Sequence, residues 1–404
     1  MSAGLRVIVG AVGLAGHTLP ALALAGELRS RGHEVLFCGF ARWRATAEGL
    51  GLRFSGSERA IAEPPDGTAA AAEPALADTV RGLVARIGEF EPDVVVGDAL
   101  TLTPSLAAEV TGTPRATLFP EVYPLHAPGL PFFSLGLLPA RTRLGAAAWR
   151  AAGPALRTRL PSTRWLAVSQ RELNRDRVAL GLAPRADPDA ADPRELVLVA
   201  TLPQLEYERA WPPGVHVVGP IGLDLPHPPV ALPPGDDPLV LVAPSTVKDP
   251  DGRLVHTALA ALGQEPVRVL VTLGGRGLGE EGPPPANAVV VDWVDYAQAM
   301  AAASLVVCHG NHGTVVKALA EGVPVLVSPA MPDDAEHGAR VAWSGAGRMI
   351  PAPLLGAGTL RSVARTMLAE PRFAERAGAI AAWAREHDGP ARAAELVERH
   401  AIKQ

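Results

Sequence analysis

The amino-acid sequence predicts an α/β protein of two Rossmann-like, doubly wound domains that face each other across a cleft. The 404 residues are too many for one ordinary core and fit two domains of roughly 200 residues each. Short runs rich in β-branched residues alternate with helical stretches rich in Ala, Leu and Arg, which is typical of parallel sheets covered by helices. A proline-rich segment at 223–238 separates two such series, and we expect it to be a linker.

The first series, at 1–222, predicts an N-terminal domain of alternating strands and helices. Pro and Gly interrupt the pattern between residues 120 and 165. Strands are expected at 6–9, 34–40, 93–97, 115–118, 165–168 and 196–200, and helices at 20–30, 43–49, 76–90 and 103–110.

The second series, at 239–404, predicts a C-terminal domain with the same rhythm. We expect its last helix to pack back on the N-terminal domain, and we expect ligands at the carboxyl ends of both sheets. Strands are expected at 239–243, 267–272, 289–292, 304–308 and 325–328, and helices at 253–262, 360–368 and 373–400, with a further helix that stops at Gly322.

Composition excludes several classes of protein. The formal net charge of −5 argues against a nucleic-acid partner and against a polybasic membrane binder. The two cysteines, Cys38 and Cys308, lie in apolar runs, which excludes a disulfide-stapled domain and a zinc finger and fits a reducing cytoplasm. The N-terminus shows no cationic leader, and no stretch reaches the roughly 20 apolar residues of a membrane span. We therefore expect a cytoplasmic protein with no membrane insertion.

A glycine-rich turn follows the first predicted strand. Gly10, Gly13 and Gly16 allow the backbone to approach another group closely. Their spacing is GxxGxxG and not the GxGxxG of dinucleotide-binding folds, and the second strand does not end on an acidic residue. The pattern therefore disfavours a nicotinamide cofactor.

His17 stands at the start of the next helix, where it can face the cleft as a general base. The positive helix terminus would help to keep it neutral. Asp98 ends a strand at the same predicted sheet edge and could fix the tautomer of His17. In the alternative interpretation His17 only caps its helix, and Asp98 caps the following helix through Thr101 or Thr103.

A second glycine-rich turn, HGNHGT at 309–314, follows the strand that ends at Cys308. It leads into a helix whose N-terminal N–H groups and dipole suit a diphosphate, while the absence of a GK[ST] sequence disfavours ATP hydrolysis. The alternative is a plain strand–turn–helix connection. His312, the extra histidine of the turn, either contacts phosphate or sugar or simply faces solvent.

Together these motifs resemble the inverting family 1 glycosyltransferases, which use nucleoside-diphosphate sugars and have the GT-B fold. The resemblance is closest to actinobacterial enzymes that glycosylate natural products, and it extends in order and spacing along nearly the whole chain. It rests on HGNHGT, Gly322-Val323-Pro324, Pro329, DDAEHGARV at 333–341, Gly345-Ala346-Gly347, VDWVDYA around Trp293, APST at 243–246, Gly16-His17, Asp98, and NRDRVALGLAP at 174–184.

The resemblance implies a role for each matched residue. His17 would be the general base with Asp98 as its partner, and no metal would be needed, because the helix terminus stabilises the departing diphosphate. The nucleotide sugar would be bound by Ser245, Thr246, Trp293 (by stacking on the base), Val294 (through its backbone), His309, Gly310, Asn311, His312, Gly313, Thr314, Asp333 and Asp334.

The sequence also departs from the family pattern. Asn311 replaces the second glycine of the turn, and Asp334 stands where Gln is usual. His337-Gly338 replaces Asn-Ala, and Asp295 stands where Pro is common. Asp334 alters which sugar hydroxyls are contacted, so the resemblance leaves the sugar open.

Five aromatic residues gather at 119–150 in a chain that is only 4% aromatic. They form either an apolar wall for a planar acceptor or a small core under a loop. The residues are Phe119, Tyr123, Phe132 and Phe133, which are the expected acceptor contacts, and Trp149.

The sequence thus predicts transfer of a sugar from a UDP- or dTDP-sugar to a hydroxyl of a hydrophobic small molecule such as a polyketide, macrolide or phenolic. No cofactor is expected, and the protein is expected to be a monomer or homodimer. Alternatives are a non-catalytic nucleotide-sugar-binding helper of a partner transferase, C-glycosylation of an aromatic acceptor, and a sugar-nucleotide epimerase, for which no acid/base cluster is evident.

Overall fold

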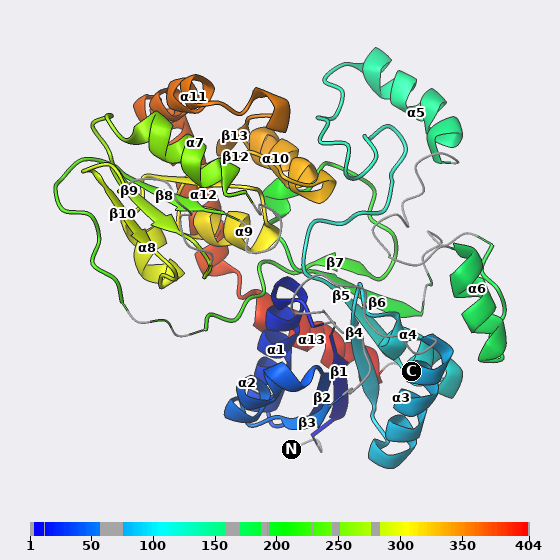
Figure 1. The fold of residues 1–404 in the computed structure, drawn as a ribbon. Helices are drawn as coiled ribbons and strands as arrows, with labels where there is room; N and C mark the ends of the chain where they lie inside the picture. Colours follow the sequence, from blue (N-terminus) through cyan, green and yellow to red (C-terminus); the bar gives the residue numbers. More distant parts are fainter. Residues whose placement is uncertain are drawn as a thin grey trace.

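The computed structural model describes residues 4–11, 13–56, 76–157, 170–186, 192, 194–225, 227, 229–244, 251–275 and 283–402. These residues form two parallel β-sheets, each with helices on both faces (Figure 1). The α/β class with two doubly wound sheets is therefore confirmed. The predicted strand at 165–168 and the Ala- and Pro-rich stretch at 57–75 lie outside the described residues.

The first sheet has seven strands in the order β3-β2-β1-β4-β5-β6-β7. Two of its strands were not predicted: β3 and β7 are edge strands of four and three residues, too short to show a period of two. The strands are β1 (Arg6–Gly10), β2 (Glu34–Gly39), β3 (Arg53–Gly56), β4 (Val94–Asp98), β5 (Arg115–Phe119), β6 (Glu195–Val199) and β7 (Val215–Val217).

The second sheet has six strands in the order β10-β9-β8-β11-β12-β13. Only its edge strand β13 was not predicted, again because it is three residues long. The strands are β8 (Leu239–Ala243), β9 (Arg268–Thr272), β10 (Ala288–Val291), β11 (Leu305–Cys308), β12 (Val325–Val327) and β13 (Gly347–Met349). The two sheets fall on either side of 223–238, although the exact domain boundaries stay a prediction.

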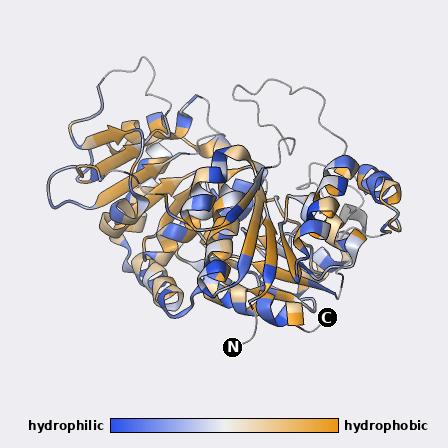
Figure 2. Ribbon diagram, turned by 90° about the horizontal axis from the view of Figure 1, so that it is seen from below, coloured by the Kyte–Doolittle hydropathy of each residue, from blue (hydrophilic) through white to orange (hydrophobic). Residues whose placement is uncertain are grey.

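The helices cover both faces of each sheet because the strands are apolar on both faces (Figure 2). In β1, Val7 and Val9 belong to one core and Ile8 belongs to the core on the opposite face. The helices are α1 (Ala15–Ser30), α2 (Arg44–Gly49), α3 (Leu76–Phe90), α4 (Leu102–Thr111), α5 (Arg143–Arg157), α6 (Gln170–Ala179), α7 (Arg253–Leu262), α8 (Tyr296–Ala302), α9 (His312–Ala320), α10 (Pro332–Ser344), α11 (Ala357–Ala369), α12 (Pro371–Glu386) and α13 (Gly389–Ile402).

The predicted single helix at 373–400 is wrong, because the chain breaks there into α12 and α13. Leu396 and Val397 of α13 join the core between the first sheet and α1, and Figure 1 shows α13 beside α1. Gly389 lies directly on Pro220, where a side chain would overlap the Pro220 carbonyl oxygen. We call the first sheet with its helices, including α13, the first half, and the second sheet with its helices the second half.

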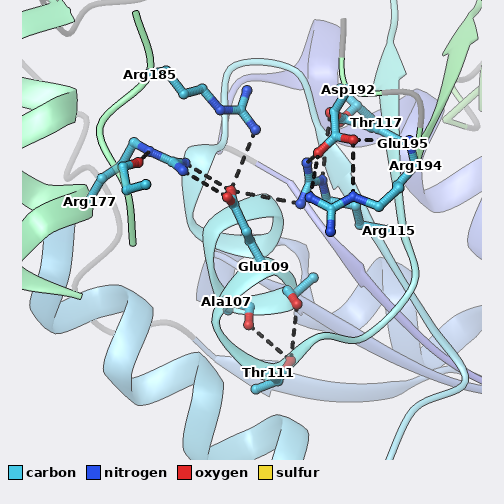
Figure 3. Close-up of polar contacts among 12 residues, drawn as sticks. Ala107, Glu109, Thr111, Arg115, Thr117, Arg177, Arg185, Asp192, Arg194 and Glu195 are labelled. Atoms are coloured by element: carbon cyan, nitrogen blue, oxygen red, sulfur yellow. Dashed lines mark hydrogen bonds and ion pairs between the residues drawn. The ribbon is translucent and has the colours of Figure 1, made fainter. Parts of the chain in front are cut away.

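A network of charged residues lies at the amino-terminal ends of β5 and β6, at the sheet edge opposite the carboxyl ends of these strands (Figure 3). Glu109 of α4 accepts hydrogen bonds from both terminal nitrogens of Arg177, at 2.8 and 2.7 Å, and also pairs with Arg115 and Arg185. Arg177 donates to the Ala183 carbonyl at 2.8 Å. The network therefore fastens α6 and the loop after it to the sheet, which explains the 174–184 motif as structural.

Candidate active site

His17 and Asp98 meet at the carboxyl edge of the first sheet. The His17 Nδ1 atom lies 2.7 Å from Asp98 Oδ1. The helix α1 begins at Ala15, five residues before the predicted start, and contains Pro20, so His17 occupies the third position of its first turn. Because a carboxylate only accepts, Nδ1 carries the proton and Nε2 is left as the basic nitrogen.

Asp98 satisfies both interpretations offered by its position in the sequence. Its side chain is fully buried, and its Oδ2 atom accepts hydrogen bonds from Leu100 N–H at 3.1 Å and from Thr101 Oγ1 at 3.2 Å. The same carboxylate thus holds the turn before α4 and orients His17. A carboxylate fixed by three donors keeps one orientation, as a base partner must.

Three carboxylates act on the partly buried His17. Burial alone would lower the pKa of His17, but the charge and hydrogen bond of Asp98, together with Glu121 and Asp333, raise it overall. The carboxylates therefore outweigh the effect of burial and make Nε2 a stronger proton acceptor. Asp333 comes from α10 of the second half, so the site lies between the two halves.

The glycines of the first turn have different roles. Gly10 and Gly97 are register partners in β1 and β4, and a Cβ at either would lie 2.7 or 3.0 Å from the ring of Pro104. They therefore allow α4 to pack closely on the sheet. Gly16, beside His17, has no heavy atom within 4 Å of its Cβ position, so this side of the helix start is open.

The turn after β11 leads into the exposed start of α9. Gly310 has φ +102°, and a Cβ there would lie 2.8 Å from the Asp334 carbonyl oxygen, so the turn is pressed against α10. The Asn311 side chain makes no capping hydrogen bond, and nothing lies within 4 Å of the Cβ position of Gly313. The N-cap residue thus leaves the first N–H groups of α9 without a side-chain cap within the described part of the chain, as an anion site requires.

The two histidines of this turn are held by the protein. His309 is buried, and its Nδ1 donates to the Ser328 carbonyl at 2.9 Å. His312 Nε2 lies 2.9 Å from Thr201 Oγ1, and the ring also hydrogen-bonds the backbone of Pro120. Loss of water lowers the pKa of His312 well below its ordinary value, with a further contribution from His337. The interpretation that His312 faces solvent is wrong.

The start of α10 separates the two predicted sugar-binding aspartates. Asp333 is partly buried on the side of His17. Asp334 is fully buried, and its Oδ2 accepts from Met331 N–H at 3.0 Å in a capping box. The prediction that Asp334 contacts the sugar is therefore wrong, because this carboxylate is used to begin the helix.

The predicted nucleobase platform is exposed on one side. Trp293 is 49% exposed, and its indole lies parallel to the ring of His227, with an interplanar angle of 3° and centroids 5.6 Å apart. The Val294 side chain is in the core. Asp295 caps α8 by accepting from two backbone N–H groups, which accounts for its place in the motif. Ser245 and Thr246 lie outside the described residues.

Three of the four aromatic residues at 119–133 are buried and do not form an open wall. Phe119, Tyr123 and Phe132 are at most 7% exposed, and Phe119 and Tyr123 pack edge to face. Phe133 packs against the core of the second half. The acceptor-binding prediction for Phe119, Tyr123 and Phe132 is wrong, because their rings are buried among protein side chains, whereas for the partly buried Phe133 it stays a prediction.

A cavity of about 1110 Å³ lies instead between the first strands and α3. Apolar side chains line it, among them Leu36, Phe54 and Phe90, together with arginines such as Arg86. Thr101, which hydrogen-bonds Asp98, is part of its wall. The sequence did not reveal this cavity, since its lining comes from five separate stretches of the chain.

A buried ion network joins the halves beside the site. Arg340 of α10 donates to Glu206 at 2.8 Å, to Glu336 at 2.9 Å and to the Leu205 carbonyl at 3.0 Å, and all three charged residues are buried. Glu206 also accepts from Tyr123 N–H at 2.7 Å. Arg340 belongs to the DDAEHGARV motif and could therefore be singled out from the sequence, whereas Glu206 lies in no motif.

Comparison with known proteins places the chain in a family. Residues 256–399 match the family "Erythromycin biosynthesis protein CIII-like, C-terminal domain". The chain is 32% identical to 4'-demethylrebeccamycin synthase of Lentzea aerocolonigenes over 434 aligned residues, which cover 98% of this chain and 99% of that protein. The chain belongs to the natural-product glycosyltransferases. It is also 27% identical to O-mycaminosyltylonolide 6-deoxyallosyltransferase of Streptomyces fradiae, with 98% of each chain covered.

Solved structures show that this glycosyltransferase has the GT-B fold. The glycotransferase of kitacinnamycin aligns with a TM-score of 0.77 at 21% identity, covering 99% of this chain and 100% of that one. The calicheamicin glycosyltransferase CalG4 aligns with a TM-score of 0.71 at 22% identity, covering 99% and 98%. The predicted family, fold and enzyme class are confirmed.

The described part of this glycosyltransferase holds neither a membrane span nor a metal cluster. None of its described helices is both long and apolar enough to cross a bilayer. No group of three or more His, Cys, Asp or Glu side chains among those residues is arranged to hold a metal ion. Metal-independent transfer stays a prediction.

Proposed function

We propose that this glycosyltransferase moves a sugar from a dTDP- or UDP-sugar to a hydroxyl of a hydrophobic small molecule, with inversion and without a metal. The observation that carries the proposal is the 2.7 Å contact between His17 Nδ1 and Asp98, which leaves Nε2 as a base at the boundary of the two halves. Asp333 of the second half acts on the same ring.

The reaction would be a single displacement. Nε2 of His17 takes the proton of the acceptor hydroxyl while its oxygen bonds to the anomeric carbon, and the bond from that carbon to the diphosphate oxygen breaks. The diphosphate leaves with both electrons of that bond toward the start of α9. There Thr314, His309 and the N–H groups around Gly313 would stabilise its charge. Attack opposite the leaving group inverts the anomeric centre.

The donor would lie on the second half. Trp293 would stack on the base, Val294 would bond it through its backbone, and Asp333 would bind sugar hydroxyls. Thymidine diphosphate is favoured because one solved GT-B neighbour, SsfS6 of Streptomyces sp. SF2575, is complexed with it. A partial relative, UDP-glycosyltransferase 2 of Phaeomoniella chlamydospora, keeps UDP in the proposal; it is 31% identical over 35% of this chain.

The acceptor would occupy the cavity between β1–β3 and α3. Its volume of about 1110 Å³ is large enough for a polyketide, macrolide or phenolic, and the partly exposed ring of Phe54 offers apolar surface. Thr101, which donates a hydrogen bond to Asp98, lines this cavity. A phenol bound here could also be deprotonated by His17 for C-glycosylation.

A donor and acceptor panel tests the proposal. Purified protein is incubated with dTDP- and UDP-sugars and with aromatic, macrolide and polyketide acceptors, and the products are read as a mass gain of hexose or deoxyhexose. The expected result is transfer by the wild type and a loss of about 10²–10⁴-fold in His17→Ala. Normal turnover in that variant would refute the base assignment. Donor cleavage only in the presence of a second protein would favour the helper function.

A further inference from the structure

Two histidines of the second half meet two consecutive residues of the first half, next to the diphosphate turn. His312 of α9 hydrogen-bonds the backbone of Pro120. His337 of α10 lies with its Nε2 atom 3.8 Å from Glu121 Oε2. The two imidazole centroids are 5.3 Å apart. These contacts connect the loop after β5 to the start of α9.

The geometry of His337 fixes where its protons lie. Its Nδ1 atom is 2.8 Å from the Gly310 carbonyl oxygen, and a carbonyl only accepts, so Nδ1 carries a hydrogen. A neutral ring would then present the lone pair of Nε2 to the Glu121 carboxylate. Both side chains are largely withdrawn from water, with exposures of 4% for His337 and 16% for Glu121. A proton on Nε2 turns this repulsion into an ion pair.

Glu121 also acts on the base. It is one of the carboxylates that favour the protonated form of His17. His337 in turn holds the carbonyl of Gly310, a residue with φ +102° in the turn that precedes α9. A series of interactions from His17 through Glu121 and His337 to Gly310 therefore connects the base of one half with the phosphate-binding turn of the other.

We propose that Glu121 and His337 form a charged pair that couples the base to the diphosphate turn, with both acting as positioning residues. This inference rests on the proposed function. In it, His337 screens His17 from the charge of Glu121 and adds a positive charge beside the turn. Histidine stands here in place of the family's usual asparagine, so the pair would be particular to chains that carry it.

Other charged and titratable groups surround the pair and must remain unchanged in a test. They come from both halves. They are His17 on α1, Asp98 at the end of β4, His312 on α9, Asp333, Glu336 and Arg340 on α10, and Glu206 after β6.

The pair predicts pH shifts of opposite sign. In Glu121→Gln, His17 loses a carboxylate, so the acidic limb of kcat/KM moves to lower pH by about half a unit or more. In His337→Asn, His17 faces an unscreened carboxylate, so the limb moves to higher pH by a similar amount. The double variant should match Glu121→Gln, because His337 without the Glu121 carboxylate is neutral and adds no charge beside His17. His337→Asn should also raise the Kd for dTDP severalfold, while Glu121→Gln should not.

A merely structural role would not reverse the sign of these shifts. Shifts of the same sign in both single variants, or no shift in either, would overturn the proposal. An independent readout is NMR of histidine-labelled protein, with the His337 signal assigned by its loss in His337→Asn. His337 should stay protonated at a pH where the Glu121→Gln variant has lost its proton, and equal titration in both proteins would overturn the pair. This measurement needs no turnover, so a failure of the proposed function would be recognised separately.

Discussion

Replacing Asp98 with asparagine tests the active site most directly. In the wild type, Asp98 Oδ1 accepts from His17 at 2.7 Å, and Oδ2 accepts from Leu100 N–H and Thr101. An amide has one acceptor oxygen, so it cannot serve both sides, and His17 is left with the wrong tautomer or no partner. We expect kcat to fall by about 10²–10⁴-fold, since orientation and stabilisation of the imidazolium are both lost.

The same substitution changes the pH profile with a defined sign. With the carboxylate removed, burial opposes only Glu121 and Asp333, so the pKa of His17 falls from its raised value. A base is active above its pKa, and the acidic limb of kcat/KM should move to lower pH. In the wild type, the stability contributed by this raised pKa is full below about pH 6.5 and is lost as the pH rises through the folded value.

Thr101→Val is the matched control. It removes one donor to Oδ2 but keeps the carboxylate on His17, so kcat should fall less than about tenfold and the pH limb should stay in place. Mass-detected initial rates from pH 5 to 9 measure both variants, and thermal unfolding confirms that both are folded. The reasoning is refuted if the folded asparagine variant keeps kcat within about threefold of wild type with an unmoved limb.

Three further predictions concern the buried ion network, His312 and the turn before α9. Arg340→Met should lower the free energy of unfolding in urea by about 3–5 kcal/mol, because Glu206 and Glu336 stay buried without their partner, whereas Arg365→Met at an exposed pair should change it by less than about 1 kcal/mol. Because the pKa of His312 is lowered in the folded protein, the unfolded chain binds a proton on this ring more readily. The free energy of unfolding should therefore fall by about 1.4 kcal/mol for each pH unit below about 6.5. His312→Gln should remove this contribution to the pH dependence, and an unchanged pH dependence would contradict the prediction. Gly310→Ala should lower the free energy of unfolding by about 1–3 kcal/mol, because Gly310 has a positive φ and its Cβ position lies against the Asp334 carbonyl oxygen. Gly313→Ala should fold normally but bind dTDP more weakly, as measured by calorimetry. Equal effects of the two substitutions on folding would count against the turn geometry.

The sequence predicted those features that depend on the local pattern of residues. Strands such as β8, with five consecutive buried apolar residues, are recognisable because a parallel sheet buries both of their faces. His17 and Asp98 were predicted together because both follow strands that end at one sheet edge, and β1 and β4 are indeed neighbours. The sheet topology thus brings His17 Nδ1 and Asp98 Oδ1, which are distant in the sequence, to 2.7 Å from each other.

What the sequence could not show depends on packing between distant segments. An aromatic cluster has the same composition whether it lines a ligand site or a small core, and only the burial of Phe119 and Tyr123 decides between them. The function of the two aspartates at the start of α10 could not be predicted either, since whether an aspartate caps a helix or faces a ligand depends on its rotamer. The partner of Arg340 could not be predicted either, because Glu206 lies 134 residues away in the chain.

The distribution of charge at the boundary fits the direction of the proposed reaction. Proton transfer makes His17 positive, and it does so among carboxylates from both halves, namely Asp98, Glu121 and Asp333. Cleavage of the donor makes the diphosphate negative, and it would do so at the open start of α9. If the halves separated, His17 would keep Asp98 but lose Asp333, and the contact between Glu121 and His337 would break. Asp333 and His337 would then no longer act on the charge balance at the base, so catalysis and closure of the two halves would depend on the same few contacts.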